Sequence, residues 1–260
     1  MIRLQKLLAE AGLGSRRTVE GWIREGRVTI GDRTAQLGDR ASRTDEVCLD
    51  GTKLDLRSEP GRGHELLLYY KPVGEVTTRR DPQGRPTVFE RLPRPGRGRW
   101  IGVGRLDVNT AGLLLLTTDG ELAHRLMHPS GGVEREYLVR LRGRPAPHTI
   151  QRLMAGVALE DGQARFDRIS ADPPGNGSHS SFRVVLHEGR NREVRRLWEA
   201  VGFEVSRLLR IRYGPIELPR DMRPGDTKLA DGGSLERLRS AVRLTSPPVA
   251  ARPASRGASK

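Results

Sequence analysis

The order of expected helices and strands is compatible with an α+β protein built from two unequal domains. At 260 residues, the chain is long enough for one large domain or two unequal ones. Residues 57–64, RSEPGRGH, form a polar stretch with Pro and Gly that is typical of a linker. We therefore expect a small domain at 1–56 and a larger one at 65–244, followed by a disordered basic tail at 245–260.

The small domain is expected to contain two helices and then strands. Leu4, Leu7 and Leu8 recur at helical spacing, and Gly12 ends that helix. Ser15 is a candidate N-cap for a second helix. The inner face of this second helix carries Val19, Trp22 and Ile23. Short strands follow at 27–30 and through 46–54.

Basic side chains lie on the outer faces of this domain: Arg3, Lys6, Arg16, Arg17, Arg24 and Arg27. Alone, such charges would usually mark a solvated surface. Two short helices, a strand–turn–strand and a basic face together resemble the S4-like RNA-binding module of ribosomal proteins and RNA-modifying enzymes. The resemblance implies that these six residues bind RNA.

In the larger domain we expect strands and helices in mixed order. LLLYY at 66–70 and WIGVGRL at 100–106 predict strands, and Asp119 is a candidate N-cap for a helix at 121–128 that Pro129 ends. The further expected elements are a strand at 135–143, a helix at 147–157, a loop at 171–180, a strand at 182–189, a helix at 191–202 and a strand at 204–218.

The charge balance predicts a polyanionic partner. The formal net charge is +14, and nucleic acid is the first candidate because each neutralised phosphate releases counterions. A membrane surface is the weaker alternative, since the basic residues are spread along the chain. No stretch reaches about 18 consecutive apolar residues, and the single Cys48 excludes an internal disulfide framework. These features predict a cytoplasmic protein.

Cofactor and metal sites are not expected. GVGRLD begins like a dinucleotide-binding fingerprint, but Asp107 stands where the third glycine belongs. His124 and His128 are four residues apart, yet Arg125 replaces the glutamate of the metalloprotease pattern and no third ligand is obvious. We therefore interpret them as surface or packing histidines, and Cys48 as a packed thiol.

Asp107 is the candidate catalytic residue. It lies in GRLDVNTAGLLLLTTDG, residues 104–120, between Arg105 and a run of four leucines. The ordinary explanation is an Asx turn, in which the carboxylate caps the amides of Asn109 or Thr110. Its setting favours another role, because an acid that stays ionised beside apolar residues needs a cation nearby. An ionised carboxylate held in this way is a potential nucleophile.

The motifs GRLDVNTAGLLLLTTDG, REYLV and EGRNREVRRL resemble the pseudouridine synthase branch that modifies ribosomal RNA, and the resemblance covers residues 1 to 240. It implies that Asp107 is the nucleophile, that Tyr137 lies against the target base, and that Arg195 pairs with Asp107, with Arg196 as second choice. It also implies a bent, mainly antiparallel sheet with helices on its faces, and chemistry that needs neither metal nor cofactor.

Spacing in the helix expected at 191–202 agrees with these roles. Its apolar stripe is Val194, Leu197, Trp198 and Val201. Arg192, Arg195 and Arg196 share a different face, so we expect three guanidiniums to be presented together. The ordinary alternatives are a solvated helix face and, for Tyr137, simple core packing. The candidates for gripping RNA are Arg105, Arg190, Arg192, Arg196, Arg210 and Arg212.

The motif details are most similar to the branch acting on large-subunit (23S) ribosomal RNA, because the small-subunit branch usually carries a second Asp where Asn109 stands. We expect a monomer that isomerises one flipped-out uridine in this RNA or in a pre-ribosomal particle. Asp107 would attack the ribose anomeric carbon or ring carbon six, or assist glycal formation. The alternatives are a non-catalytic ribosome-assembly factor and a synthase acting on 16S ribosomal RNA or transfer RNA.

Overall fold

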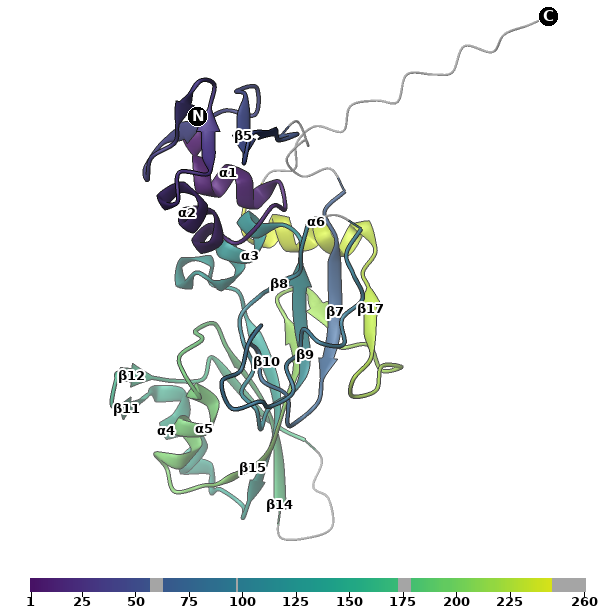
Figure 1. The fold of residues 1–260 in the computed structure, drawn as a ribbon. Helices are drawn as coiled ribbons and strands as arrows, with labels where there is room; N and C mark the ends of the chain where they lie inside the picture. Colours follow the sequence, from purple (N-terminus) through teal and green to yellow (C-terminus); the bar gives the residue numbers. More distant parts are fainter. Residues whose placement is uncertain (57–62, 97, 173–178, 245–260) are drawn as a thin grey trace, which may run out of the picture.

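A computed structural model describes residues 1–56, 63–96, 98–172 and 179–244. A small N-terminal module lies above a larger domain that is built on a nine-stranded sheet (Figure 1). The tail expected at 245–260 and most of the linker expected at 57–64 lie outside the described residues.

The module has the expected helices and strands. Its elements are β1 (Ile2–Arg3), α1 (Leu4–Glu10), α2 (Arg16–Arg24), β2 (Val28–Ile30), β3 (Arg33–Thr34), β4 (Arg40–Ala41), β5 (Val47–Leu49) and β6 (Thr52–Lys53). Helix α1 starts at Leu4 because Ile2 and Arg3 pair with β4. Ser15 caps α2 as expected, with its Oγ accepting from the Thr18 amide at 2.9 Å.

The module contacts the larger domain through α1 and the loop after it. Lys6 Nζ lies 2.9 Å from Glu121 Oε2 on α3. At Gly12 the two backbones approach so closely that an added Cβ would lie 2.8 Å from the Cα of Gly98. Figure 1 shows α3 directly beneath the module's helices.

The larger domain contains eleven further strands and four helices among the residues described, besides a short 3-10 helix at Pro129–Gly131. Its strands are β7 (Leu66–Lys71), β8 (Ile101–Gly102), β9 (Ala111–Thr117), β10 (Arg135–Arg142), β11 (Val157–Leu159), β12 (Gly162–Ala164), β13 (Arg168–Ala171), β14 (His179–Leu186), β15 (Val205–Tyr213), β16 (Ile216–Glu217) and β17 (Thr227–Leu229), with β16 a short antiparallel partner of β15. Its helices are α3 (Gly120–Met127), α4 (Pro147–Ala155), α5 (Glu193–Glu199) and α6 (Gly232–Ala241).

The sheet is two antiparallel halves joined by one parallel pair. Its main order is β13-β14-β10-β15-β9-β7-β17, with β16 paired to β15 and β8 to β9. Strands β9 and β15 run parallel where Ala111 and Gly112 meet Leu209 and Arg210. The other named pairs of this sheet are antiparallel in the part of the chain described. The expected α+β class with a mainly antiparallel sheet is confirmed.

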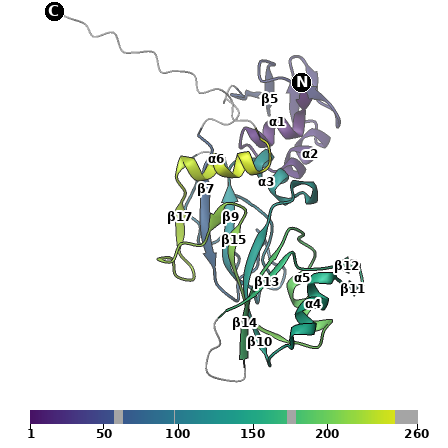
Figure 2. The ribbon, with the colours of Figure 1, turned by 180° about the vertical axis from the view of Figure 1, so that it is seen from behind.

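Helices cover both faces of the sheet, which explains the run of four leucines. Leu114 and Leu116 belong to the core that contains Trp198 of α5, whereas Leu113 and Leu115 belong to the core that contains Leu238 of α6. Alternate residues of a strand face opposite sides, so a strand covered on both sides is apolar throughout. Figure 2 shows α6 across one side and α4 with α5 on the other.

Several element boundaries differ from those expected. Helix α5 begins at Glu193 because the preceding Arg192 has a φ of 50°, in the left-handed region. Of the strand expected at 100–106 only Ile101–Gly102 is formed. Of the loop expected at 171–180, Ala171 belongs to β13 and residues 179–180 belong to β14, whereas residues 173–178 lie outside the described part. Among the residues described, no helix has the length and apolar content that crossing a bilayer requires.

Candidate active site

Asp107 lies in the turn that leads into β9, next to the parallel junction of the sheet. Thr110 N donates to Asp107 O at 3.0 Å, so the turn is closed by main-chain atoms. The carboxylate forms no hydrogen bond or ion pair at normal distance with any residue the structure describes. The Asx-turn explanation therefore does not account for this acid.

The carboxylate lines a cavity of about 490 Å³. Tyr137 of β10 and Thr110 are among the residues around it. The other residues that line it include Thr77, Phe89, Arg105, Arg135, Glu188, Arg190, Arg192, Glu193, Leu208, Arg210 and Tyr213. A cavity of this size can hold a small organic group such as a nucleotide base with its sugar.

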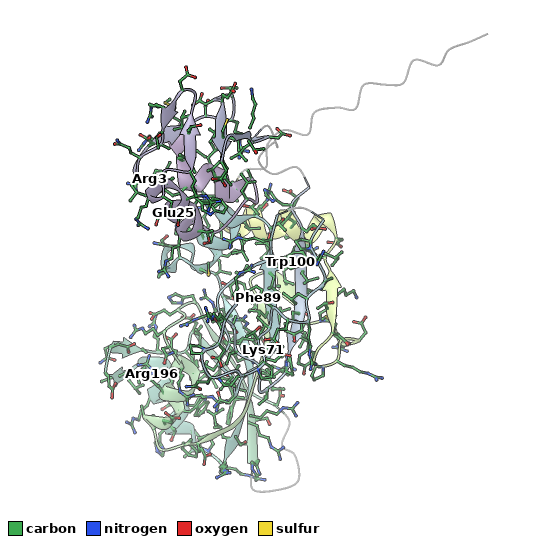
Figure 3. All side chains as sticks on the ribbon, in the orientation of Figure 1. Arg3, Glu25, Lys71, Phe89, Trp100 and Arg196 are labelled. Carbon is green, nitrogen blue, oxygen red and sulfur yellow. The ribbon has the colours of Figure 1, made fainter. Side chains whose placement is uncertain are left out.

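Two buried cations lie behind the Asp107 turn. Lys71, with no exposed surface, donates from Nζ to Thr110 O at 2.9 Å and to Pro72 O at 2.8 Å. Burial lowers the pKa of Lys71 to about 8, against the attraction of Glu75 and then Asp107. Figure 3 places Lys71 in the interior of the larger domain, below Phe89.

Arg195 is the second buried cation. Its Nη2 donates to Asn109 O and its Nη1 to Val205 O, each at 2.8 Å. Burial lowers the pKa of Arg195, as does the charge of Arg192, whereas Asp107 raises it. The structure shows no ion pair between Arg195 and Asp107, because the guanidinium is bonded to main-chain carbonyls.

Tyr137, Tyr213 and two buried arginines also line the cavity. Tyr137 is buried in the core that contains Trp198 and also lines the cavity. Tyr213 lies between two guanidiniums, with Arg135 Cζ at 5.0 Å and Arg210 Cζ at 5.1 Å from its ring centroid. Stacked cations of this kind add positive charge to the wall of the cavity.

Of the six arginines expected to bind RNA in the larger domain, four line the cavity, whereas Arg196 and Arg212 do not. Arg105 and Arg192 are exposed at the cavity. Arg196 forms two 2.9 Å bonds to the carboxylate of Asp161, which also lies 3.5 Å from Arg190. The three guanidiniums expected together on α5 are not presented together, since Arg192 precedes the helix and is exposed, Arg195 is buried against main-chain carbonyls, and Arg196 binds Asp161. Figure 3 shows Arg196 on the side of α4 and α5, away from Lys71.

Arg210 and Arg212 are also held within the protein. Arg210 is 2% exposed and donates from Nε to Leu113 O at 2.7 Å, so it is a wall residue rather than a surface contact. Arg212 binds Glu136 and Glu134, each at 2.8 Å.

On the module, the expected basic residues remain mostly exposed. Arg3, Lys6 and Arg16 line a second cavity of about 390 Å³, together with Arg40. The side chains of Arg17 and Arg24 are exposed. Arg27 bonds Asp50 through Nε at 2.8 Å, and Lys6 is engaged with Glu121.

Sequence reasoning missed Lys71, Thr77, Arg135 and Tyr213. A signal existed for Lys71, because a lysine ends the fully apolar strand LLLYY and can be buried only with acceptors around it. Arg135 lies in the REYLV motif but was not singled out. No local pattern marked Thr77 or Tyr213.

The cavity thus combines an unbonded carboxylate, a tyrosine and buried cations, in a basic chain with an N-terminal helix–strand module. The chain belongs to the RNA pseudouridylate synthase family, whose model matches residues 65–200. The S4 domain model matches residues 2–47.

Relatives and a solved structure agree with this family. Ribosomal large subunit pseudouridine synthase B of Pseudomonas aeruginosa is 51% identical over 242 residues, which cover 93% of this chain and 63% of that protein. This chain therefore spans less than two thirds of that relative. The protein of the same name from Escherichia coli (strain K12) is 52% identical over 244 residues, covering 93% and 84%. A solved pseudouridylate synthase has a TM-score of 0.63 and 26% identity, covering 92% of this chain and 100% of that one.

Proposed function

We propose that this chain isomerises a uridine of 23S ribosomal RNA to pseudouridine, with Asp107 as the nucleophile. The observation that carries the proposal is the half-buried carboxylate that faces a nucleotide-sized cavity and has no partner among the described residues. The names of the relatives, which specify the large ribosomal subunit, support the choice of RNA.

The reaction rearranges bonds within one nucleotide. The bond from ribose C1′ to ring N1 breaks, the base turns, and a bond from C1′ to ring C5 forms. C5 loses a proton and N1 gains one, so no atom is gained or lost overall. Asp107 acts by attack on C1′, by attack on ring C6, or by assisting glycal formation. Tyr137 lies against the base and assists removal of the C5 proton.

RNA binding is assigned to both parts of the chain. The target nucleotide is flipped out of its stack at a cost of a few kcal/mol, and the exposed Arg105 and Arg192 at the cavity contact the neighbouring backbone. The module at 1–56, joined through a linker at 57–64 to the catalytic domain at 65–244, holds the flanking RNA. The protein acts as a cytoplasmic monomer on this RNA or on a pre-ribosomal particle.

Asp107→Asn tests the catalytic assignment, because an amide is similar in shape but a poor nucleophile. Pseudouridine formation in a 23S transcript should be lost while the affinity for the transcript stays within about twofold, since no contact that orders the loop is removed. Product formation by the variant at the normal rate would refute the role of Asp107. RNA binding without product by the wild type would favour the assembly-factor alternative.

The choice of RNA has its own test. In a strain that lacks this protein, one pseudouridine should disappear from 23S ribosomal RNA and return when the gene is restored. Loss of the modification from 16S ribosomal RNA or transfer RNA would redirect the substrate but leave the chemistry intact.

A further inference from the structure

We propose that Thr77 is a positioning residue for Asp107, and that its hydroxyl fixes the backbone just before the nucleophile. The inference rests on the proposed catalytic role of Asp107. Thr77 belongs to the segment between β7 and β8, far from the motifs that identify the family site, and its side chain is half-buried and lines the same cavity.

One hydroxyl satisfies both main-chain groups of a single residue. Thr77 Oγ1 donates to Leu106 O at 2.9 Å and accepts from Leu106 N at 3.2 Å. A threonine hydroxyl has one proton to donate and lone pairs to accept, so this arrangement fits its bonding capacity. Leu106 is thereby held at both its amide and its carbonyl, one residue before Asp107.

Every carbonyl from 106 to 110 accepts a hydrogen bond. The donors are Thr77 Oγ1 for Leu106 (2.9 Å), Thr110 N for Asp107 (3.0 Å), Gly74 N for Val108 (2.7 Å), Arg195 Nη2 for Asn109 (2.8 Å) and Lys71 Nζ for Thr110 (2.9 Å). The main chain of the loop is fixed throughout, while the Asp107 carboxylate has no bond. The segment 71–77 supplies three of these five donors.

Among these donors, Thr77 is the one whose effect can be isolated. Lys71 and Arg195 are charged and interact with Asp107, so replacing either also changes the electrostatics of the site. The donors at 74 and 110 are main-chain amides. Replacing Thr77 with Val keeps the shape and removes only the hydroxyl, which frees Leu106 and shifts the carboxylate.

The experiment measures the rate constant of a single turnover. Enzyme in excess is mixed with a 23S transcript tritiated at uridine C5, and tritium release is followed alongside RNA affinity and melting temperature. For Thr77→Val we expect the rate constant to fall about 10- to 100-fold, as for a displacement of up to about 1 Å. RNA affinity should stay within about twofold, since Thr77 does not bind RNA in this proposal.

Two matched variants separate positioning from general stability. Thr77→Ser keeps the hydroxyl and should return the rate constant to within about threefold of wild type. Thr78→Val is the neighbouring control, because Thr78 Oγ1 donates to Arg80 O at 3.0 Å and accepts from Arg80 N at 3.4 Å, away from the Asp107 loop. Its removal should leave the rate unchanged.

The proposal is overturned if Thr77→Val turns over at the wild-type rate, if Thr77→Ser is as slow as the valine variant, or if the loss appears in RNA affinity. Rates are compared at a temperature at which all variants are folded, and a loss that merely follows the unfolded fraction also overturns it. A wild-type protein without turnover on any RNA would instead refute the proposed function.

Discussion

The loop that carries Asp107 and two loops of the N-terminal module, those of Asp39 and Asp45, use their aspartates in opposite ways. In the module, Asp39 accepts from Gln36 N at 2.8 Å and from Arg33 at 2.7 Å, and Asp45 accepts from Ser42 N at 2.9 Å. At Asp107 the turn is closed by main-chain atoms and by neighbouring segments, and the carboxylate is left without a bond.

This difference separates a structural acid from a reactive one. A structural aspartate orders its own loop, so its oxygens are already occupied by amides. Asp107 lies in a loop that other residues order, so its oxygens are available to a ligand in the cavity.

The largest expected effect is a crossed pair of substitutions. Asp107→Asn should reduce turnover by at least about 10⁴-fold, as loss of a nucleophile does, with little change in melting temperature because no hydrogen bond is lost. Asp39→Asn should lower the melting temperature slightly and leave turnover intact. Tritium release and calorimetry on both variants measure this. A clear stability loss in Asp107→Asn would mean that its carboxylate also orders the loop.

The next effect concerns the parallel junction that supports the Asp107 loop. Gly112 has a φ of 107°, and an added Cβ would lie 2.3 Å from Arg210 O. Gly112→Ala should destabilise the protein by about 4 kcal/mol or more. Gly31→Ala in the module is the control, because Gly31 has a φ of 56° but nothing within 4 Å of its added Cβ. Strain alone should cost it about 1–2 kcal/mol. If chemical denaturation showed equal losses of stability in the two variants, the close approach of Arg210 O would not be the reason for the loss in Gly112→Ala.

Lys71→Met should produce a pH-dependent loss of stability that is smaller than the loss in Gly112→Ala. It leaves the carbonyls of Thr110 and Pro72 without this donor, at a cost of about 1–3 kcal/mol. The pKa of Lys71 is lowered to about 8 in the folded state. The unfolded chain therefore binds more protons between pH 8 and about 10.4, and wild-type stability should rise over this window relative to the variant.

Over this window, the free energy of unfolding of the wild type relative to the variant should rise by about 3 kcal/mol. Denaturant midpoints of both proteins at pH 7, 8.5 and 10 measure it. A constant difference across these pH values would mean that Lys71 keeps an ordinary pKa.

The smallest expected effect is the contribution of Asp39 to stability at acidic pH. The Arg33 hydrogen bond lowers the pKa of Asp39, with a further contribution from the Gln36 amide. A lowered pKa adds stability at pH values above the unfolded pKa, and this stability is lost as the pH falls through the folded one. Between pH 7 and 3 the wild type should therefore lose slightly more melting temperature than Asp39→Asn. Parallel curves would show that the Asp39 bonds do not contribute.

Local pattern accounted for much of the fold. Helical spacing located α1 and α2, the capping residues Ser15 and Asp119 were identified correctly, and apolar runs located β7. The pattern was less informative at Arg192, whose left-handed backbone conformation shortens α5. An arginine side chain gives no indication of that conformation. The partners of the arginines on α5 were not predictable either.

By itself, the sequence determined that this chain has a basic N-terminal module, a larger mixed domain and an aspartate isolated between a turn and an apolar strand. Only the tertiary structure decided what surrounds that aspartate. Thr77 reaches Leu106 across 29 positions, Lys71 reaches Thr110 across 39, and Arg195 reaches Asn109 across 86. Periodicity and capping report contacts within a few residues, whereas hydrogen bonds across such separations arise only when the sheet and its helices pack together.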